Sequence, residues 1–168
     1  MILVKNINQY EPSYVYFTNS MKNNIMKNGN FIKILYLSPL VKMNGIYLKM
    51  DIVNYLNENN IYRNNYIYNP YMYIELIEKI KNIEIDILSR SGIIEKKPEY
   101  DLYKKLISGN IKIITDIIEE KYNNFVIKIS GIWENECQYG LNYKFMRGNK
   151  NDTILVKKEM YNIINYDK

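Results

Sequence analysis

The stretch FVIKISGIWENECQYGLNYKFMR, residues Phe125–Arg147, carries the strongest fold signal in this chain. Its two halves, Phe125–Trp133 and Tyr139–Arg147, alternate β-branched or aromatic residues with polar ones, as strands with one buried face do. The polar connection between them, Glu134–Gln138, is short. Because short connections join antiparallel neighbours, the stretch predicts an antiparallel hairpin.

A turn centred on Glu136 would fix the register of this hairpin. The pairs on one face would be Trp133 with Tyr139, Gly131 with Leu141, Ile129 with Tyr143, and Ile127 with Phe145. The other face would carry Lys128 directly opposite Lys144, and like charges at such a pair are destabilising. Solvation, a register shifted by a residue or two, and contact with phosphates would each relieve this repulsion, and all three stay open. Gly131 and Gly140 indicate a bulge or the close approach of another backbone.

The rest of the chain adds shorter candidate strands and two Asn-rich segments. Strands are predicted at Tyr14–Phe17, Phe31–Leu37, Ile46–Met50, Tyr66–Tyr68 and Ile111–Ile114. The dipeptide Asn44-Gly45 is a turn signal that predicts a hairpin between the second and third of these strands. Asn19–Asn30 and Asn57–Asn65 are expected to be surface loops.

Two helices are predicted between these strands. Asn69 can cap the first and Pro70 suits its first position, and apolar residues at helical spacing continue to about Leu88. The second helix is expected from near Pro98 to Gly109, where glycine favours a C-terminal cap.

This order of elements predicts an α+β fold in a single domain over residues 1–168. The sheet is expected to be mostly antiparallel. A five-stranded oligonucleotide-binding-type barrel with two helices inserted between strands is compatible with this order, and so is an ordinary α+β sandwich. The tail, Thr153–Lys168, is expected to add a strand and a short helix.

The composition favours a polyanionic partner, with one reservation. The net charge is +5, and lysines that neutralise phosphates release counterions. However, the abundance of Lys, Asn, Ile and Tyr and the absence of Ala and His indicate an AT-rich gene, which supplies Lys and Tyr without any binding role. Position is therefore better evidence than the count of 18 tyrosines.

Catalytic motifs are scarce, so we expect a binding protein with no cofactor and no metal rather than an enzyme. Without His, the commonest general base and most nucleophile systems are missing. The single cysteine, Cys137, follows the acidic Glu136 and is a poor nucleophile. The order Asp86, Glu95, Lys97 leaves a Mg²⁺-dependent nuclease as a weaker alternative.

Basic and aromatic residues alternate in the predicted strands, as a groove for single-stranded nucleic acid requires. We expect phosphate contacts from Lys33, Lys49, Lys128, Lys144 and Arg147, and base stacking on Tyr36, Tyr47, Tyr68, Trp133 and Tyr139. For Trp133, the single tryptophan, a role as a core anchor is the competing interpretation.

Four segments carry a family resemblance: FIKILYLSPLVKMNGIYLKM, IELIEKIKNIEIDIL, KPEYDLYKKLISGNIKI and KISGIWENECQYGLNYKF. Their order resembles single-stranded DNA-binding proteins of poxviruses and related large DNA viruses, over roughly Phe31 to Phe145. The resemblance implies an oligonucleotide-binding-type barrel, sequence-independent binding of single strands, and a role in genome replication or repair. The long acidic tail with which many such proteins recruit partners is missing here.

The alternative function is that of a structural or interaction protein, a virion component or a homo-oligomer subunit, with a tyrosine-rich interface. No apolar run has the roughly 20 residues that span a bilayer, so no membrane association is expected. The N-terminal residues lack a signal-peptide pattern, and the lone cysteine suits a reducing compartment. We therefore expect an intracellular protein, in the host cytoplasm if it is viral.

Overall fold

The protein has an α+β fold, mostly sheet, with two α-helices. The computed structural model describes residues 4–23, 28–39, 41–60, 63–113 and 124–148. In chain order the strands are β1 (Lys5–Asn6), β2 (Val15–Phe17), β3 (Met21–Lys22), β4 (Asn30–Leu37), β5 (Lys42–Asn44), β6 (Ile46–Met50), β7 (Leu56–Asn60), β8 (Arg63–Ile67), β9 (Lys97–Glu99), β10 (Asn110–Ile113), β11 (Phe125–Glu134) and β12 (Gln138–Arg147). The helices are the 3-10 turns η1 (Ile7–Gln9), η2 (Pro12–Tyr14) and η3 (Pro70–Tyr73) and the α-helices α1 (Ile74–Ser89) and α2 (Asp101–Ile107).

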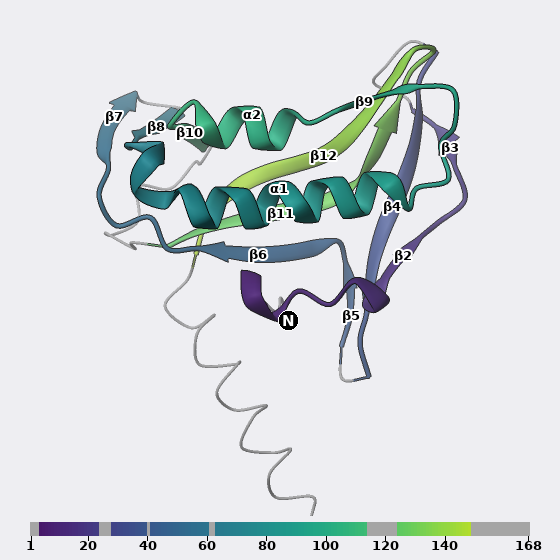
Figure 1. Cartoon of the computed structure of the whole chain (residues 1–168), viewed down its shortest axis with the longest axis horizontal. Helices are drawn as coiled ribbons and strands as arrows, with labels where there is room; N and C mark the ends of the chain where they lie inside the picture. Colours follow the sequence, from purple (N-terminus) through teal and green to yellow (C-terminus); the bar gives the residue numbers. More distant parts are fainter. Residues whose placement is uncertain (1–3, 24–27, 40, 61–62, 114–123, 149–168) are drawn as a thin grey trace, which may run out of the picture.

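Strand β11 is the centre of the larger sheet (Figure 1). It pairs with β12 along one edge, as the sequence predicts. Along its other edge it pairs with two strands in succession: β6 beside Phe125–Ile129 and β4 beside Gly131–Glu134. Strands β10, β8 and β7 form a separate three-stranded sheet. The pairing is mostly antiparallel, with β1 beside β6 and β9 beside β12 as the parallel exceptions.

A bulge in β11 separates the segments that β6 and β4 occupy. The register against β12 shifts between Ile129 and Gly131. Gly45 lies against this bulge with φ +99°, and a Cβ there would lie 2.5 Å from the backbone oxygen of Ile129. Glycine at position 45 therefore lets the chain turn from β5 into β6 against the β11 backbone.

The predicted Asn44-Gly45 hairpin is wrong. Strand β4 pairs with β5 instead, and between these strands the Ser38 amide donates to the Val41 carbonyl oxygen at 3.0 Å. Gly45 is the corner that leads from β5 to β6. The pattern places a turn correctly, but the chain changes its pairing partner there.

The predicted hairpin register is confirmed for the half farther from the turn and wrong for the half nearer to it. Ile129 pairs with Tyr143, and Lys128 lies directly opposite Lys144. Beyond the bulge every pair shifts by one residue, so Trp133 lies opposite Gly140 instead of Tyr139. A bulge adds one residue to one strand, and this extra residue accounts for the shift.

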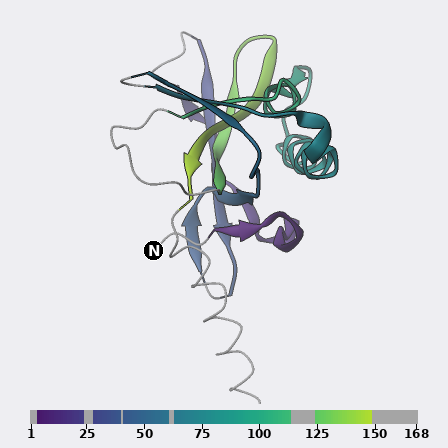
Figure 2. The ribbon, with the colours of Figure 1, turned by 90° about the vertical axis from the view of Figure 1, so that its left-hand side faces the viewer.

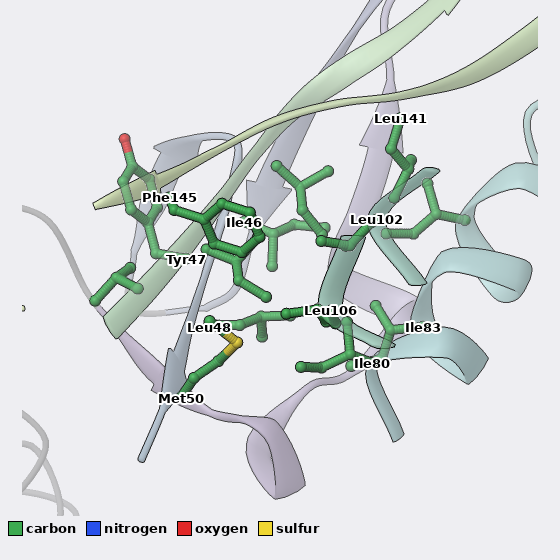
Figure 3. Packing of buried hydrophobic residues seen from close by; sticks show 14 of the residues in the cluster. Ile46, Tyr47, Leu48, Met50, Ile80, Ile83, Leu102, Leu106, Leu141 and Phe145 are labelled. Carbon is green, nitrogen blue, oxygen red and sulfur yellow. The ribbon is translucent and has the colours of Figure 1, made fainter. Parts of the chain in front are cut away.

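Both helices lie on the same side of the larger sheet (Figure 2). Helix α1 buries Ile77, Ile80, Ile83 and Ile87 on one stripe, which confirms the predicted helical spacing. Figure 3 shows Ile80 and Ile83 of α1 and Leu102 and Leu106 of α2 close to side chains of β6 and β12. The core is therefore the space between the sheet and the two helices.

The predicted ends of the helices need two corrections. The Asn69 side chain accepts a hydrogen bond from the Tyr71 amide at 3.1 Å, but it caps the 3-10 turn η3, and α1 begins four residues later than Pro70. Pro98 belongs to β9, which pairs with β12, so α2 begins at Asp101. Proline cannot donate to a helix or a ladder, but it is tolerated at a sheet edge.

The expected loop at Asn57–Asn65 is also wrong, because β7 and β8 form a hairpin there. Within Asn19–Asn30 the short strand β3 pairs with β4, and residues 24–27 lie outside the described ranges. The tail Thr153–Lys168 lies outside them as well. The strands of the described part do not close into a five-stranded barrel. Within the described ranges, no helix is long and apolar enough to cross a bilayer.

Glu84 links the two helices through a buried carboxylate. It lies on α1, has 0% exposure, and accepts the backbone N–H groups of Leu102 at 3.1 Å and Tyr103 at 2.9 Å, in the first turn of α2. Burial raises the pKa of Glu84 to about 7, although the two N–H groups favour the ionised form. Asp101 adds to this rise in pKa and Lys104 opposes it.

Replacing Gly45 with alanine is expected to destabilise the fold by about 2–4 kcal/mol, since the new Cβ would clash with the Ile129 carbonyl as well as strain the backbone. Gly92→Ala is the matched control, because Gly92 also has a positive φ, +75°, but has open space around it. Urea unfolding of both variants checks this. Equal losses of stability would mean that the contact of Gly45 with Ile129 contributes nothing to the free energy of unfolding.

Replacing Glu84 with glutamine is expected to flatten the pH dependence of stability. The folded-state pKa of Glu84 lies above the unfolded value, so its contribution is fully present below about pH 4.5 and is lost as the pH rises through about 7. The loss is at most about 3 kcal/mol. Urea unfolding at pH 5 and pH 8 should show the wild type losing more stability than Glu84→Gln over this interval. Parallel losses in the two proteins would contradict the prediction.

Candidate functional site

The sheet face opposite the helices carries aromatic and basic side chains in rows. The helix side is identified by Tyr143 of β12, whose hydroxyl donates to the Asp101 carboxylate of α2 at 2.7 Å. Side chains alternate along a strand, so the residues between those on the helix side point the other way. The registers align the following rows on that other face: Phe31, Trp133 and Gly140; Lys33, Gly131 and Asn142; Tyr47, Lys128 and Lys144. We call Phe31, Lys33, Lys128, Trp133, Asn142 and Lys144 the open face.

Two aromatic rings of the open face lie against glycine backbone. A Cβ at Gly131 would lie 2.4 Å from Cζ of Phe31, and a Cβ at Gly140 would lie 2.9 Å from Cζ2 of Trp133. Phe31 and Trp133 are opposite each other in the β4–β11 pair, and both are half-buried. The glycines thus leave room for two neighbouring rings on the sheet surface, each with part of its surface accessible.

The lysines of the open face have no carboxylate partner within the described ranges. Lys33, Lys128 and Lys144 form no ion pair with any residue that the structure describes. The Lys128 amine instead lies 5.3 Å from the centre of the Tyr47 ring, and Lys144 opposite it is exposed. Both lysines are therefore available to an anionic ligand, and the like-charge pair predicted from the sequence is present.

A hollow of about 540 Å³ continues the open face around the outer edge of β12. Strand β9 pairs with β12 only up to Gly140, and beyond it no described strand covers that edge. Trp133, Asn142 and Lys144 line this edge hollow from the open face, and Lys105 of α2 and Lys112 of β10 line it from the other elements. Among the described lining residues the single carboxylate, Asp101, already accepts the Tyr143 hydroxyl. The edge hollow therefore has an excess of positive charge.

The structure gathers half of the residues that the sequence proposes for nucleic-acid binding. Lys33, Lys128, Trp133 and Lys144 belong to the open face, and Lys49 lies one row further along it, next to Tyr47. Lys49 is paired with Asp51 at 3.0 Å, so its charge is already balanced.

The stacking role expected for four tyrosines needs correction, because their rings are buried. Tyr36 has 0% exposure, Tyr68 5%, Tyr47 7% and Tyr139 7%. Tyr36 packs edge-on against Tyr14 at 5.7 Å between ring centres, and the Tyr68 hydroxyl donates to the Leu106 carbonyl oxygen at 2.8 Å. Burial raises the pKa of Tyr36, Tyr68 and Tyr139. Rings enclosed in this way offer no free surface to a base.

Arg147 also has an internal role. Its Nε donates to the Tyr66 hydroxyl at 3.0 Å, and its guanidinium lies 4.8 Å from the centre of the Tyr66 ring. Tyr66 packs in turn against Phe125, with ring centres 5.0 Å apart. Arg147 therefore joins the three-stranded sheet to β12. These contacts indicate a structural role for Arg147 instead of the expected contact with phosphate.

Sequence reasoning missed Phe31, Lys105, Lys112 and Asn142. Phe31 opens a predicted strand, but nothing in the sequence shows that it lies beside Trp133. Lys105 lies on a helix and Lys112 on a strand of the other sheet, so only the tertiary structure brings them to β12. The two glycines gave a usable signal, the close approach of another backbone. That approach is confirmed by the backbone oxygens of Ile32 at Gly131 and of Glu99 at Gly140, and an aromatic ring lies against each glycine as well.

The residues of the alternative nuclease site do not form a metal site. Asp86 accepts hydrogen bonds from Arg90 and, at 2.8 Å, from the Tyr10 hydroxyl. Glu95 is exposed in the segment that follows α1. Within the described ranges, no group of three or more Asp, Glu, Cys or His side chains is placed to hold a metal ion. The charges of Asp86 and Arg90 serve instead to fasten the N-terminal segment to α1, since Arg90 also donates to the Pro12 carbonyl oxygen.

Comparison with known proteins adds no relative: no protein-family model, no curated protein and no solved structure matches this chain.

Proposed function

We propose that the protein binds single-stranded nucleic acid, without sequence preference, on the open face and in the edge hollow. The supporting observation is the juxtaposition of two accessible rings, Phe31 and Trp133, with three lysines that lack a carboxylate partner. In this proposal the rings stack on bases, and Lys33, Lys128 and Lys144 contact the backbone. Lys105 and Lys112 extend the phosphate contacts around the edge of β12.

The position of the rings favours single strands over duplexes. Phe31 and Trp133 lie against strand backbone on a sheet surface, where a base must present its flat face to reach them. Bases in a duplex are stacked on each other and cannot do so. Both α-helices lie on the opposite side of the sheet, so neither is available to enter a major groove from this face.

The same chemistry explains the lack of sequence preference. Every base has a flat face, and stacking on an aromatic ring contributes about 1–3 kcal/mol per base whatever its identity. Lysine amines interact with phosphates as point charges and do not distinguish bases. The resemblance noted above extends this proposal to single-stranded DNA in viral-type genome replication or repair, with binding rather than catalysis as the activity. An oligonucleotide-binding-type barrel is the finer form of the fold that the resemblance implies.

Titration with poly(dT) is expected to quench the fluorescence of Trp133, the single tryptophan, because a base would stack on its indole ring. The triple variant Lys33→Gln/Lys128→Gln/Lys144→Gln should bind more weakly. Its plot of log K against log salt should be shallower by about 2, since each phosphate contact to a single strand contributes about 0.7.

The control for this experiment is Lys42→Gln/Lys97→Gln/Lys104→Gln, which removes the same charge from exposed positions outside the open face. It should keep most of the wild-type affinity. If the wild type shows neither quenching nor salt dependence, the proposed function is wrong. If the two triple variants lose affinity equally, net charge alone attracts the strand and the open face is not the site.

Gly140→Ala is expected to weaken poly(dT) binding up to about tenfold, because the new Cβ would push the Trp133 ring from its position. The displacement should also shift the emission maximum of Trp133. Gly92→Ala, which meets no atom within 4 Å, is the control and should leave affinity unchanged. An unchanged affinity in a folded Gly140→Ala protein with a shifted emission maximum would exclude Trp133 from the binding surface.

A further inference from the structure

A second surface carries exposed apolar side chains. Tyr71 is 80% exposed, Met72 59%, Val53 56% and Ile74 38%. They belong to one area, because the Tyr73 hydroxyl accepts the backbone N–H groups of Val53 at 3.2 Å and of Asn54 at 3.0 Å and so joins residues 53–54 to η3. We call Val53, Tyr71, Met72 and Ile74 the apolar patch. Exposed apolar side chains that cluster in this way are typical of an interaction site.

The charges beside the apolar patch balance each other. A hollow of about 660 Å³ next to it is lined by Tyr71, Met72 and Ile74 and by four charged side chains, Lys49, Asp51, Glu75 and Lys79. Lys49 pairs with Asp51 at 3.0 Å, and Lys79 donates to the Asn8 side chain at 3.1 Å. Glu75 forms no ion pair with any described residue. Among the described lining residues, two amines and two carboxylates balance to no net charge.

We propose that a second copy of this chain binds the apolar patch, so that the protein forms a two-fold symmetric dimer. Two copies of a chain with a net charge of +5 repel each other over most of their surface, and a charge-balanced area is where this repulsion is smallest. The same balance disfavours a polyanion here. A two-fold axis brings a surface against itself, which requires that the surface complement its own charges.

Helix α1 supplies the self-complementary pair. Glu75 and Lys79 are four residues apart, so they lie on one side of the helix, next to the exposed Ile74. Two antiparallel copies of α1 would set Glu75 opposite the partner's Lys79, and the reverse, with the two-fold axis close to residue 77 of the helix. Tyr71 and Met72 of each copy would then contact the far part of the partner's helix, and tyrosine and methionine are enriched at protein interfaces.

The dimer would leave the open face and the edge hollow accessible. The hollow at the apolar patch includes Lys49 and Asp51 at the end of β6, whereas the edge hollow follows β12. Strand β11 separates β6 from β12 in the sheet (Figure 1). The two proposals therefore rest on different residues, and each is tested separately.

Sedimentation velocity without nucleic acid tests this proposal. The wild type is expected to sediment with twice the monomer mass at concentrations up to about 100 μM, a range that covers weak dimers. Tyr71→Ser/Met72→Ser should be monomeric. Ile94→Ser, which removes a side chain of 77% exposure outside the patch, is the control and should remain dimeric. A monomeric wild type over the whole range, or association that appears only when poly(dT) is added, would overturn the proposal.

A charge exchange tests the two-fold pairing itself. Glu75→Lys and Lys79→Glu should each weaken the dimer by about fivefold or more, because each places like charges opposite one another. The double variant Glu75→Lys/Lys79→Glu should recover most of the affinity, since the pair is restored with exchanged signs. Additive weakening in the double variant would contradict the proposed pairing, and poly(dT) binding by all three variants should stay near the wild-type level.

Discussion

The bulge in β11 is the constraint on which the other features depend. It divides one long strand into a segment that pairs with β6 and a segment that pairs with β4. Between β5 and β6 the chain bends at Gly45, which lies against the backbone of Ile129 at the bulge. A side chain at position 45 would clash with the Ile129 carbonyl oxygen, at the point where β6 begins to pair with β11.

The bulge also decides which residues reach the open face. Without it, Trp133 would lie opposite Tyr139, another large ring. The shift of one residue places Gly140 there, and the indole occupies the space that a side chain would fill. Gly131, directly after the bulge, makes the same room for Phe31. A single extra residue in β11 thus allows two partly exposed rings to lie side by side on the sheet surface. It also keeps Tyr139 in the core.

The distribution of ion pairs distinguishes the two sides of the sheet. Lys96 pairs with Glu134 and Lys104 with Glu99, and hydrogen bonding to these lysines lowers the pKa of both carboxyl groups. On the open face the lysines have no such partners among the residues that the structure describes, and Lys128 lies directly opposite Lys144. Such a pair costs about 0.2–1 kcal/mol, a cost that an anionic ligand would offset. These lysines lie where aromatic rings are accessible, and this arrangement supports binding more than the net charge of +5 does.

The sequence by itself determined the local structure: the α1 stripe, the strands β6, β11 and β12, the Lys128–Lys144 pair and the need for glycine at positions 131 and 140. These features depend on the spacing of neighbouring residues, which periodicity records. Only the tertiary structure decided which rings are buried, since Tyr36 and Trp133 both lie in alternating strands and differ in the layer that covers them. It also decided that Lys105 and Lys112 meet β12, and that the chain changes partners at Gly45. The spacing of apolar residues along a segment reports whether it forms a helix or a strand. It does not report which distant segment packs against it, because the same spacing suits many partners.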